Sequence, residues 1–275
     1  MRFAILLSST VLSLLSTTHT QAQNVDLVFP PPENKKGSLQ EGMLVVMPGG
    51  FVDTTFYTTT IQAIQEATNM RLWAVMPAIE SKLCVLECFS PQACRLQNRV
   101  TPLIAKAKEM GYGGEGFGPN VFASGHSLGA ICASTIVEQF WDTPTPYAAF
   151  IALDGSGVTV DFPAPNFHIN AELAGGLTRP SVAYKILQTS DAAANSGLLY
   201  NPVVIIPGIS HTSFSPGYDG MGDLEAEKSD EEAVREIGRV ASAFIHVRVS
   251  LNFVFWFWFF TCMKDSSSAF LWFFL

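Results

Sequence analysis

The chain has 275 residues, 48% hydrophobic and 15% charged, which is long enough for one large α/β domain with a sizeable core. Its formal net charge is −8, which argues against a nucleic-acid partner because phosphate-backbone binding needs clustered Lys and Arg. No internal repeat and no Pro/Gly/Ser-rich linker divides the sequence, so one domain is favoured over two small ones.

The first 22 residues are typical of a secretory signal. Arg2 precedes an apolar run from Ala4 to Leu15, and the small residues Thr20-Gln21-Ala22 indicate cleavage after Ala22. The apolar run is too short to span a bilayer, which needs about 20 residues. We therefore expect a mature chain that begins at Gln23 and is secreted or enters an endomembrane lumen, where disulfides form.

The cysteines are interpreted in that oxidising setting. Cys84, Cys88 and Cys94 lie close together, and we expect a disulfide within this group, with a pairing that the sequence leaves open. A zinc site is the weaker alternative because no His lies nearby at ligand spacing. Cys132 is expected as a small buried apolar residue rather than a reactive thiol.

From residue 43 onward, short apolar runs alternate with helical patterns. The expected strands are 43–47, 71–77, 121–124, 147–153, 183–189 and 202–208, and the expected helices are 57–69, 100–111, 128–141 and 229–247. Continuous apolar runs between helices predict an α/β fold with a mostly parallel central sheet and helices on both faces. Ligands of such sheets bind beyond the carboxyl ends of the strands.

The last expected helix begins with a capping box of Ser229 and Glu232 and ends the domain 23–247. Residues 248–275 form an aromatic-rich tail in which MKDSSS interrupts the apolar sequence. That polar break argues against a transmembrane helix and against a lipid-anchor signal. Two interpretations of the tail stay open: sequence foreign to the native protein, or a segment that contacts a membrane.

Gly125-His126-Ser127-Leu128-Gly129 matches the pattern G-x-S-x-G at the junction between an expected strand and an expected helix. In this motif the glycines allow a tight strand-to-helix turn that exposes the serine hydroxyl above the sheet. Ser127 is then a nucleophile. The alternative is an ordinary serine that caps the helix.

A serine nucleophile needs a base, and the base needs an acid that fixes its tautomer. His211 follows the last expected strand and is the candidate base. Asp191 follows the strand before it and is the preferred acid, while Asp154, in LDGSG, is the alternative. Oxyanion donors are expected from the backbone N–H of Gly50 or Phe51, in MPGGF, and of Leu128, just after the nucleophile.

The segments PGGF, GHSLGA, QTSD and GISHTSF resemble the oxyanion loop, nucleophile elbow, acid turn and histidine loop of the α/β-hydrolase superfamily, in the order Ser, Asp, His. The resemblance extends from Met43 to Phe244 and, more loosely, to small secreted or chlorophyllase-like esterases. It implies the α/β-hydrolase fold and esterase-type acyl transfer through an acyl-enzyme, followed by hydrolysis. Only 20 positions separate Asp191 from His211, a short connection that keeps Asp154 in consideration.

The other histidines are interpreted without a chemical role. His126 is expected to pack beside the nucleophile, His168 to lie in a loop or lid, and His246 to lie on the last helix. Five phenylalanines are expected in loops at the strand carboxyl ends, where they would form an apolar wall for a hydrophobic ester rather than a sugar or a peptide. They are Phe51, Phe56, Phe162, Phe167 and Phe214.

The sequence thus predicts a serine hydrolase that cleaves carboxylic esters with a hydrophobic acyl or alcohol part. No metal, nucleotide or flavin motif is visible, so no cofactor is expected. Two alternatives remain: an inactive hydrolase-fold protein that only binds a ligand or partner, and an acyltransferase that uses the same triad.

Overall fold

The central feature of the computed structural model is a seven-stranded sheet with the strand order β1-β3-β2-β4-β5-β6-β7. Every neighbouring pair is parallel except β1 and β3. The strands are β1 (Leu27–Phe29), β2 (Glu41–Met47), β3 (Arg71–Met76), β4 (Val121–His126), β5 (Ala149–Leu153), β6 (Asn166–Ala171) and β7 (Val203–Ile206). The structure describes residues 23–35, 40–88, 94–114, 116–144, 147–155, 158, 162–174, 203–220 and 224–265.

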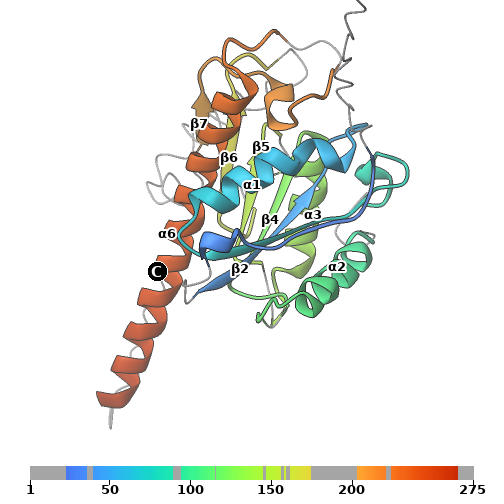
Figure 1. Ribbon diagram of the computed structural model, residues 1–275. Coiled ribbons are helices and arrows are strands. Elements are labelled where there is room, and N and C mark those ends of the chain that lie inside the picture. The colour runs from blue at the N-terminus through green and yellow to red at the C-terminus, as the bar shows by residue number, and fades with distance from the viewer. Residues whose placement is uncertain are drawn as a thin grey trace, which may run out of the picture.

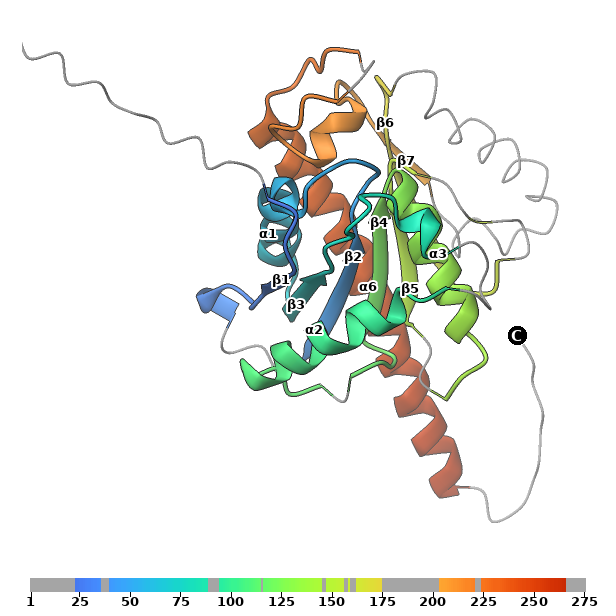
Figure 2. The ribbon, with the colours of Figure 1, turned by 90° about the vertical axis from the view of Figure 1, so that its right-hand side faces the viewer.

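Helices cover both faces of this sheet, as predicted (Figures 1 and 2). One face carries α1 (Thr58–Ala67) and α6 (Asp230–Asp265), and the other carries α2 (Gln97–Glu109) and α3 (Leu128–Phe140). Four short 3₁₀ helices lie in the connections of the described chain: η1 (Glu33–Lys35), η2 (Thr54–Tyr57), η3 (Cys84–Leu86) and η6 (His211–Phe214).

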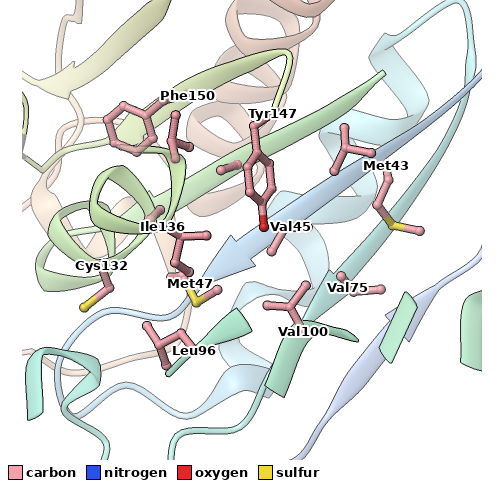
Figure 3. Packing of buried hydrophobic residues seen from close by; sticks show 14 of the residues in the cluster. Met43, Val45, Met47, Val75, Leu96, Val100, Cys132, Ile136, Tyr147 and Phe150 are labelled. Carbon is pink, nitrogen blue, oxygen red and sulfur yellow. The ribbon is translucent and has the colours of Figure 1, made fainter. Parts of the chain in front are cut away.

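The strand residues alternate between two hydrophobic clusters, one on each face of the sheet. In β2, Met43, Val45 and Met47 belong to the cluster beneath α2 and α3, whereas Leu44 and Val46 belong to the cluster beneath α1 and α6. Figure 3 shows Met47 among side chains from α2 and α3. Because both faces are buried, the strands need the continuous apolar runs that made them recognisable.

The strand order reverses next to β2. The chain passes from β2 to β3 on one side and then returns to place β4 on the other side of β2. The loops that follow β2 and β4 therefore lead to helices on opposite faces of the sheet, and ligands of such sheets bind outside the carboxyl ends of the strands at such a point. Gly50 and Ser127 lie in these two loops.

Two strands of the structure are not predicted by the sequence pattern. β1 is a three-residue edge strand, too short for a periodic signal. β6 lies within a segment expected to be a loop, because Asn166, His168 and Asn170 interrupt its apolar pattern, yet all three side chains are buried. The expected strand 183–189 lies outside the described residues.

The final helix is longer than expected. α6 continues past residue 247 to Asp265 and projects beyond the sheet (Figures 1 and 2). No Gly or Pro follows Gly238 in this helix, so nothing in the local sequence ends it at the expected boundary. Of the helices in the described ranges, none is both long and apolar enough to cross a membrane.

Candidate active site

Ser127 occupies the sharp turn between β4 and α3. Its backbone angles are φ 54° and ψ −123°, a conformation that strains a residue with a side chain. A Cβ on Gly125 would clash with the Gly129 backbone, and one on Gly129 would clash with the backbone of Met47 and Pro48, so the turn requires both glycines. The Ser127 side chain makes no capping hydrogen bond to α3, which removes the helix-cap interpretation.

His211 begins η6, just beyond β7, at the carboxyl edge of the sheet as expected. Its Nδ1 lies 2.6 Å from Oδ2 of Asp154. A carboxylate only accepts hydrogen bonds, so Nδ1 carries the proton and, in the neutral ring, Nε2 is left as a base. The capping box of Ser210 and Ser213 holds the backbone of this loop.

Asp154 follows β5 and is fully buried. Its second oxygen, Oδ1, accepts a hydrogen bond from the Ala171 N–H at 2.9 Å, so both carboxylate oxygens have partners. The next residue, Gly155, approaches the nucleophile turn: a Cβ there would lie 2.6 Å from the Ser127 carbonyl oxygen. Asp154, the alternative acid, thus lies beside both His211 and the turn at Ser127. Asp191, the acid preferred from the sequence, lies outside the described residues.

One of the expected oxyanion donors, the Phe51 N–H, already has a hydrogen-bond acceptor. The Phe51 N–H donates a hydrogen bond to the Lys82 carbonyl at 2.8 Å, so it is already used. Among the described residues nothing accepts from the Gly50 N–H, and a Cβ on Gly50 would lie 2.7 Å from Leu128 Cδ1. Leu128 is the first residue of α3, whose N–H has no partner within the helix. Gly50 and Leu128 are therefore the pair of candidate donors.

The loop after β3 supports this arrangement. Lys82 accepts the hydrogen bond from Phe51 and pairs its ammonium with Asp53 at 2.6 Å, so two of its groups hold the oxyanion loop. Cys84 then forms a disulfide with Cys132 of α3. This corrects the expectation of a free Cys132, whose partner lies 48 positions away and was hidden from local spacing.

Cys88 and Cys94 form the second disulfide, which confirms the expected pairing within the cysteine group. The zinc alternative is wrong, because all these thiols are consumed in disulfides. In the described part of the chain, no group of three or more His, Cys, Asp and Glu side chains is placed to hold a metal ion.

Backbone strain is concentrated around the same loops. Among the described residues, the non-glycine residues with positive φ are Phe51 (64°), Lys82 (54°), Ser127 (54°) and Asp154 (43°). Each such conformation costs on the order of 1–3 kcal/mol and persists only where the surrounding structure imposes it, most often at functional sites. They are the candidate nucleophile Ser127, the candidate acid Asp154, Phe51 of the candidate oxyanion loop, and Lys82, which accepts the Phe51 N–H.

The phenylalanines do not form the wall that was expected. Phe162, Phe167 and Phe214 are buried in the core, and Phe167 lies in β6 with its ring stacked on Phe244 rather than in a loop. Phe56 is half-buried against Tyr218. Phe51 alone of the five is strongly exposed, at 57%, directly beside Gly50.

The remaining histidines differ in position. His168 lies in β6, not in a loop, and burial lowers its pKa to about 4. His246 is exposed on α6. His126 is buried beside Ser127 as expected, but both of its ring nitrogens have hydrogen-bonding partners, a feature that the sequence did not reveal.

Comparison with known proteins supports the fold. No family model matches the chain, and no curated protein matches its sequence. The structure is similar to Thermogutta terrifontis esterase 2 phosphonylated by sarin, with a TM-score of 0.52 and 13% identity over 80% of this chain and 88% of that chain. It is also similar to the same esterase with butyrate bound, with a TM-score of 0.51 and 13% identity over 80% and 87% of the two chains. The chain thus has the α/β-hydrolase fold.

Proposed function

We propose that this chain, an α/β-hydrolase in fold, is a serine hydrolase of carboxylic esters. Ser127 is the nucleophile, His211 the general base and Asp154 the acid that orients it. The backbone N–H groups of Gly50 and Leu128 stabilise the oxyanion. Asp154 takes the place that the sequence reading gave to Asp191.

The reaction proceeds in two acyl-transfer steps. Ser127 Oγ attacks the ester carbonyl carbon while His211 Nε2 accepts the hydroxyl proton, and the carbonyl π pair becomes the oxyanion. When the tetrahedral intermediate collapses, the C–O bond breaks and His211 returns the proton to the leaving alcohol. Water then attacks the acyl-enzyme by the same route and releases the carboxylic acid.

The observation that carries the proposal is the hydrogen-bonded pair of His211 and Asp154 beside the strained Ser127 turn. A buried carboxylate that holds Nδ1–H selects the one tautomer in which Nε2 is basic. A serine that served only as a helix cap would need neither this pair nor a positive φ. This arrangement argues against the inactive binding protein, which requires no such tautomer.

The substrate we infer is a small ester with an apolar part. Phe51 presents an exposed ring next to the proposed oxyanion donor Gly50, and burial of apolar surface there would contribute about 25 cal/mol per Å². The neighbouring esterase named above is known phosphonylated by sarin and with butyrate bound, which agrees with a small acyl chain. The two disulfides agree with a secreted location.

A fluorophosphonate probe tests the nucleophile. We expect the wild-type protein to be labelled and to hydrolyse p-nitrophenyl esters, and Ser127→Ala to lose both properties. Ser242→Ala is the matched control, because Ser242 is a buried serine on α6 whose hydroxyl donates to the Arg239 carbonyl. Labelling that survives Ser127→Ala would refute the assignment, and a wild-type protein inert to probe and esters would revive the binding-protein alternative.

A further inference from the structure

His126 and Tyr57 form a continuous chain of hydrogen bonds beneath the candidate site. The Gly49 N–H lies 2.8 Å from the Tyr57 hydroxyl, which in turn lies 2.8 Å from His126 Nδ1. On the other side of the ring, His126 Nε2 lies 3.1 Å from the His211 carbonyl oxygen. This series of hydrogen bonds begins at Gly49 in the candidate oxyanion loop, next to Gly50, and ends on the backbone carbonyl of the proposed base, His211.

The direction of each hydrogen bond is fixed by its end groups. The His211 carbonyl only accepts, so His126 Nε2 donates, and the neutral ring must then accept at Nδ1. The Tyr57 hydroxyl consequently donates to Nδ1 and accepts from the Gly49 N–H. Each donor in this series of hydrogen bonds then has one acceptor. If one hydrogen bond were reversed, a neighbouring donor or acceptor would lose its partner.

The surrounding packing keeps these groups in place. The His126 ring lies 4.4 Å from the His211 ring and 5.6 Å from the Phe214 ring, measured between centroids. A Cβ at Gly49 would lie 2.9 Å from both His126 Nδ1 and the Tyr57 hydroxyl, so only glycine allows this approach. Burial, followed by the neighbouring His211, lowers the pKa of His126 well below its usual value, which keeps the ring in the neutral form that the chain requires.

We propose that Tyr57 and His126 are positioning residues that couple the oxyanion loop to the loop of the catalytic base. Tyr57 fixes the peptide that precedes Gly50, and His126 fixes the peptide of His211. The residue before the nucleophile thus aligns the oxyanion donors with the base in one rigid unit. This inference rests on the proposed function and adds to it two residues that do not touch the substrate.

The hydroxyl of Tyr57 is tested by Tyr57→Phe, measured on p-nitrophenyl butyrate. We expect kcat to fall about 10- to 100-fold with KM nearly unchanged, since misplacement by a fraction of an ångström acts on the transition state more than on binding. Tyr147→Phe is the matched control: Tyr147 is equally buried, and its hydroxyl donates to Gln97 Oε1 away from the site. We expect it to keep the wild-type kcat.

A double-substitution cycle separates coupling from independent effects. His126→Leu removes both ring hydrogen bonds while keeping an apolar side chain against Phe214. If the two residues act as one unit, the double variant Tyr57→Phe/His126→Leu loses no more kcat than His126→Leu alone. In His126→Gln, the side-chain amide restores a donor toward the His211 carbonyl, and we expect it to recover part of the lost kcat.

Three results would overturn the inference in a wild-type enzyme that hydrolyses the ester. They are additive losses in the cycle, a Tyr57→Phe variant that retains the wild-type kcat, and a loss in Tyr147→Phe as large as that in Tyr57→Phe. Urea unfolding of each variant establishes that the folded protein is being assayed. A wild-type protein that neither hydrolyses esters nor reacts with the fluorophosphonate would instead refute the proposed function itself.

Discussion

Asp154 Oδ2 lies 2.6 Å from His211 Nδ1, although 57 positions separate the two residues in the chain. The carboxylate is buried, and its other oxygen accepts the Ala171 N–H, so it cannot turn away without losing two hydrogen bonds. A carboxylate held in this way fixes both the orientation and the tautomer of the imidazole. The proposed acid thus follows β5, the strand that pairs with β4, which leads to the proposed nucleophile.

Asp154→Asn tests this acid against Asp191→Asn. The amide keeps an oxygen for the Ala171 N–H but no longer accepts the Nδ1 proton, so the imidazole takes the wrong tautomer. We expect kcat on p-nitrophenyl butyrate to fall by about 10³- to 10⁴-fold in Asp154→Asn. Asp191→Asn should retain activity.

The opposite pattern, in which Asp191→Asn abolishes turnover and Asp154→Asn does not, would show that Asp191 is the acid, as the sequence prefers. Fluorophosphonate labelling rates of the two variants provide a second measurement that does not depend on the ester chosen. In both variants the labelling rate should change in parallel with kcat, because the reaction of Ser127 with the probe also requires the base.

From the sequence, Asp154 is only the alternative acid, because one strand of the sheet lacks a continuous apolar run. Asn166, His168 and Asn170 give β6 the pattern of a polar loop, so the sequence predicts 183–189 as the strand before the last. In the structure, β6 itself pairs with β7. Buried polar side chains depend on hydrogen-bonding partners that the fold supplies, and the local sequence pattern does not predict those partners.

The elements that were predictable are those with a local physical cause. Continuous apolar runs indicated the central parallel strands, and the glycines of GHSLG indicated the strained turn at Ser127. The pairing of Cys84 with Cys132, the use of the Phe51 N–H by Lys82, and the hydrogen bonds of His126 all join segments distant in sequence. Such contacts are set by tertiary packing, so spacing alone could not provide them.

Phe51→Ala tests the exposed ring as a determinant of ester preference. The Phe51 N–H, not the side chain, donates to Lys82, so the substitution should leave the oxyanion loop intact. We expect kcat/KM for p-nitrophenyl octanoate to fall by about tenfold while that for the acetate changes less than twofold, since about 1–2 kcal/mol of apolar contact is lost. Met110→Ala, an exposed apolar residue just after α2, is the control. Equal losses for both esters would show that the ring does not contact the acyl chain.

His168 makes the stability of the fold depend on pH. Its folded-state pKa is about 4, below the unfolded value of about 6.5, so between these values the unfolded chain binds a proton that the folded chain does not. Its contribution is therefore present above pH 6.5 and is lost as the pH falls toward 4. From pH 7 to 4.5, this residue should remove about 2 kcal/mol from the free energy of unfolding.

His168→Gln removes the titrating ring but leaves a buried amide in its place. We expect the fall in unfolding free energy between pH 7 and 4.5, measured by urea titration, to be smaller in this variant than in the wild type. His246→Gln, at an exposed position on α6, should keep the wild-type dependence. Identical slopes for His168→Gln and the wild type would contradict a buried neutral ring at this position.

The two disulfides should differ in their effect on stability and activity. Cys84–Cys132 closes a separation of 48 positions, whereas Cys88–Cys94 closes one of 6. Loop-closure entropy then predicts losses of about 4 and about 2 kcal/mol on removal of the first and second bridge. The paired variants Cys84→Ser/Cys132→Ala and Cys88→Ser/Cys94→Ser, unfolded in urea, measure this difference.

Only the first bridge joins the loop that holds Phe51 to the helix that follows Ser127. Its removal should therefore lower kcat in the folded protein, because Lys82 loses its fixed distance from α3 and the Gly50 donor moves away from the oxyanion. The Cys88→Ser/Cys94→Ser variant should keep the wild-type kcat. Equal kcat in both paired variants would show that Lys82 and the oxyanion loop keep their positions without the Cys84–Cys132 bond.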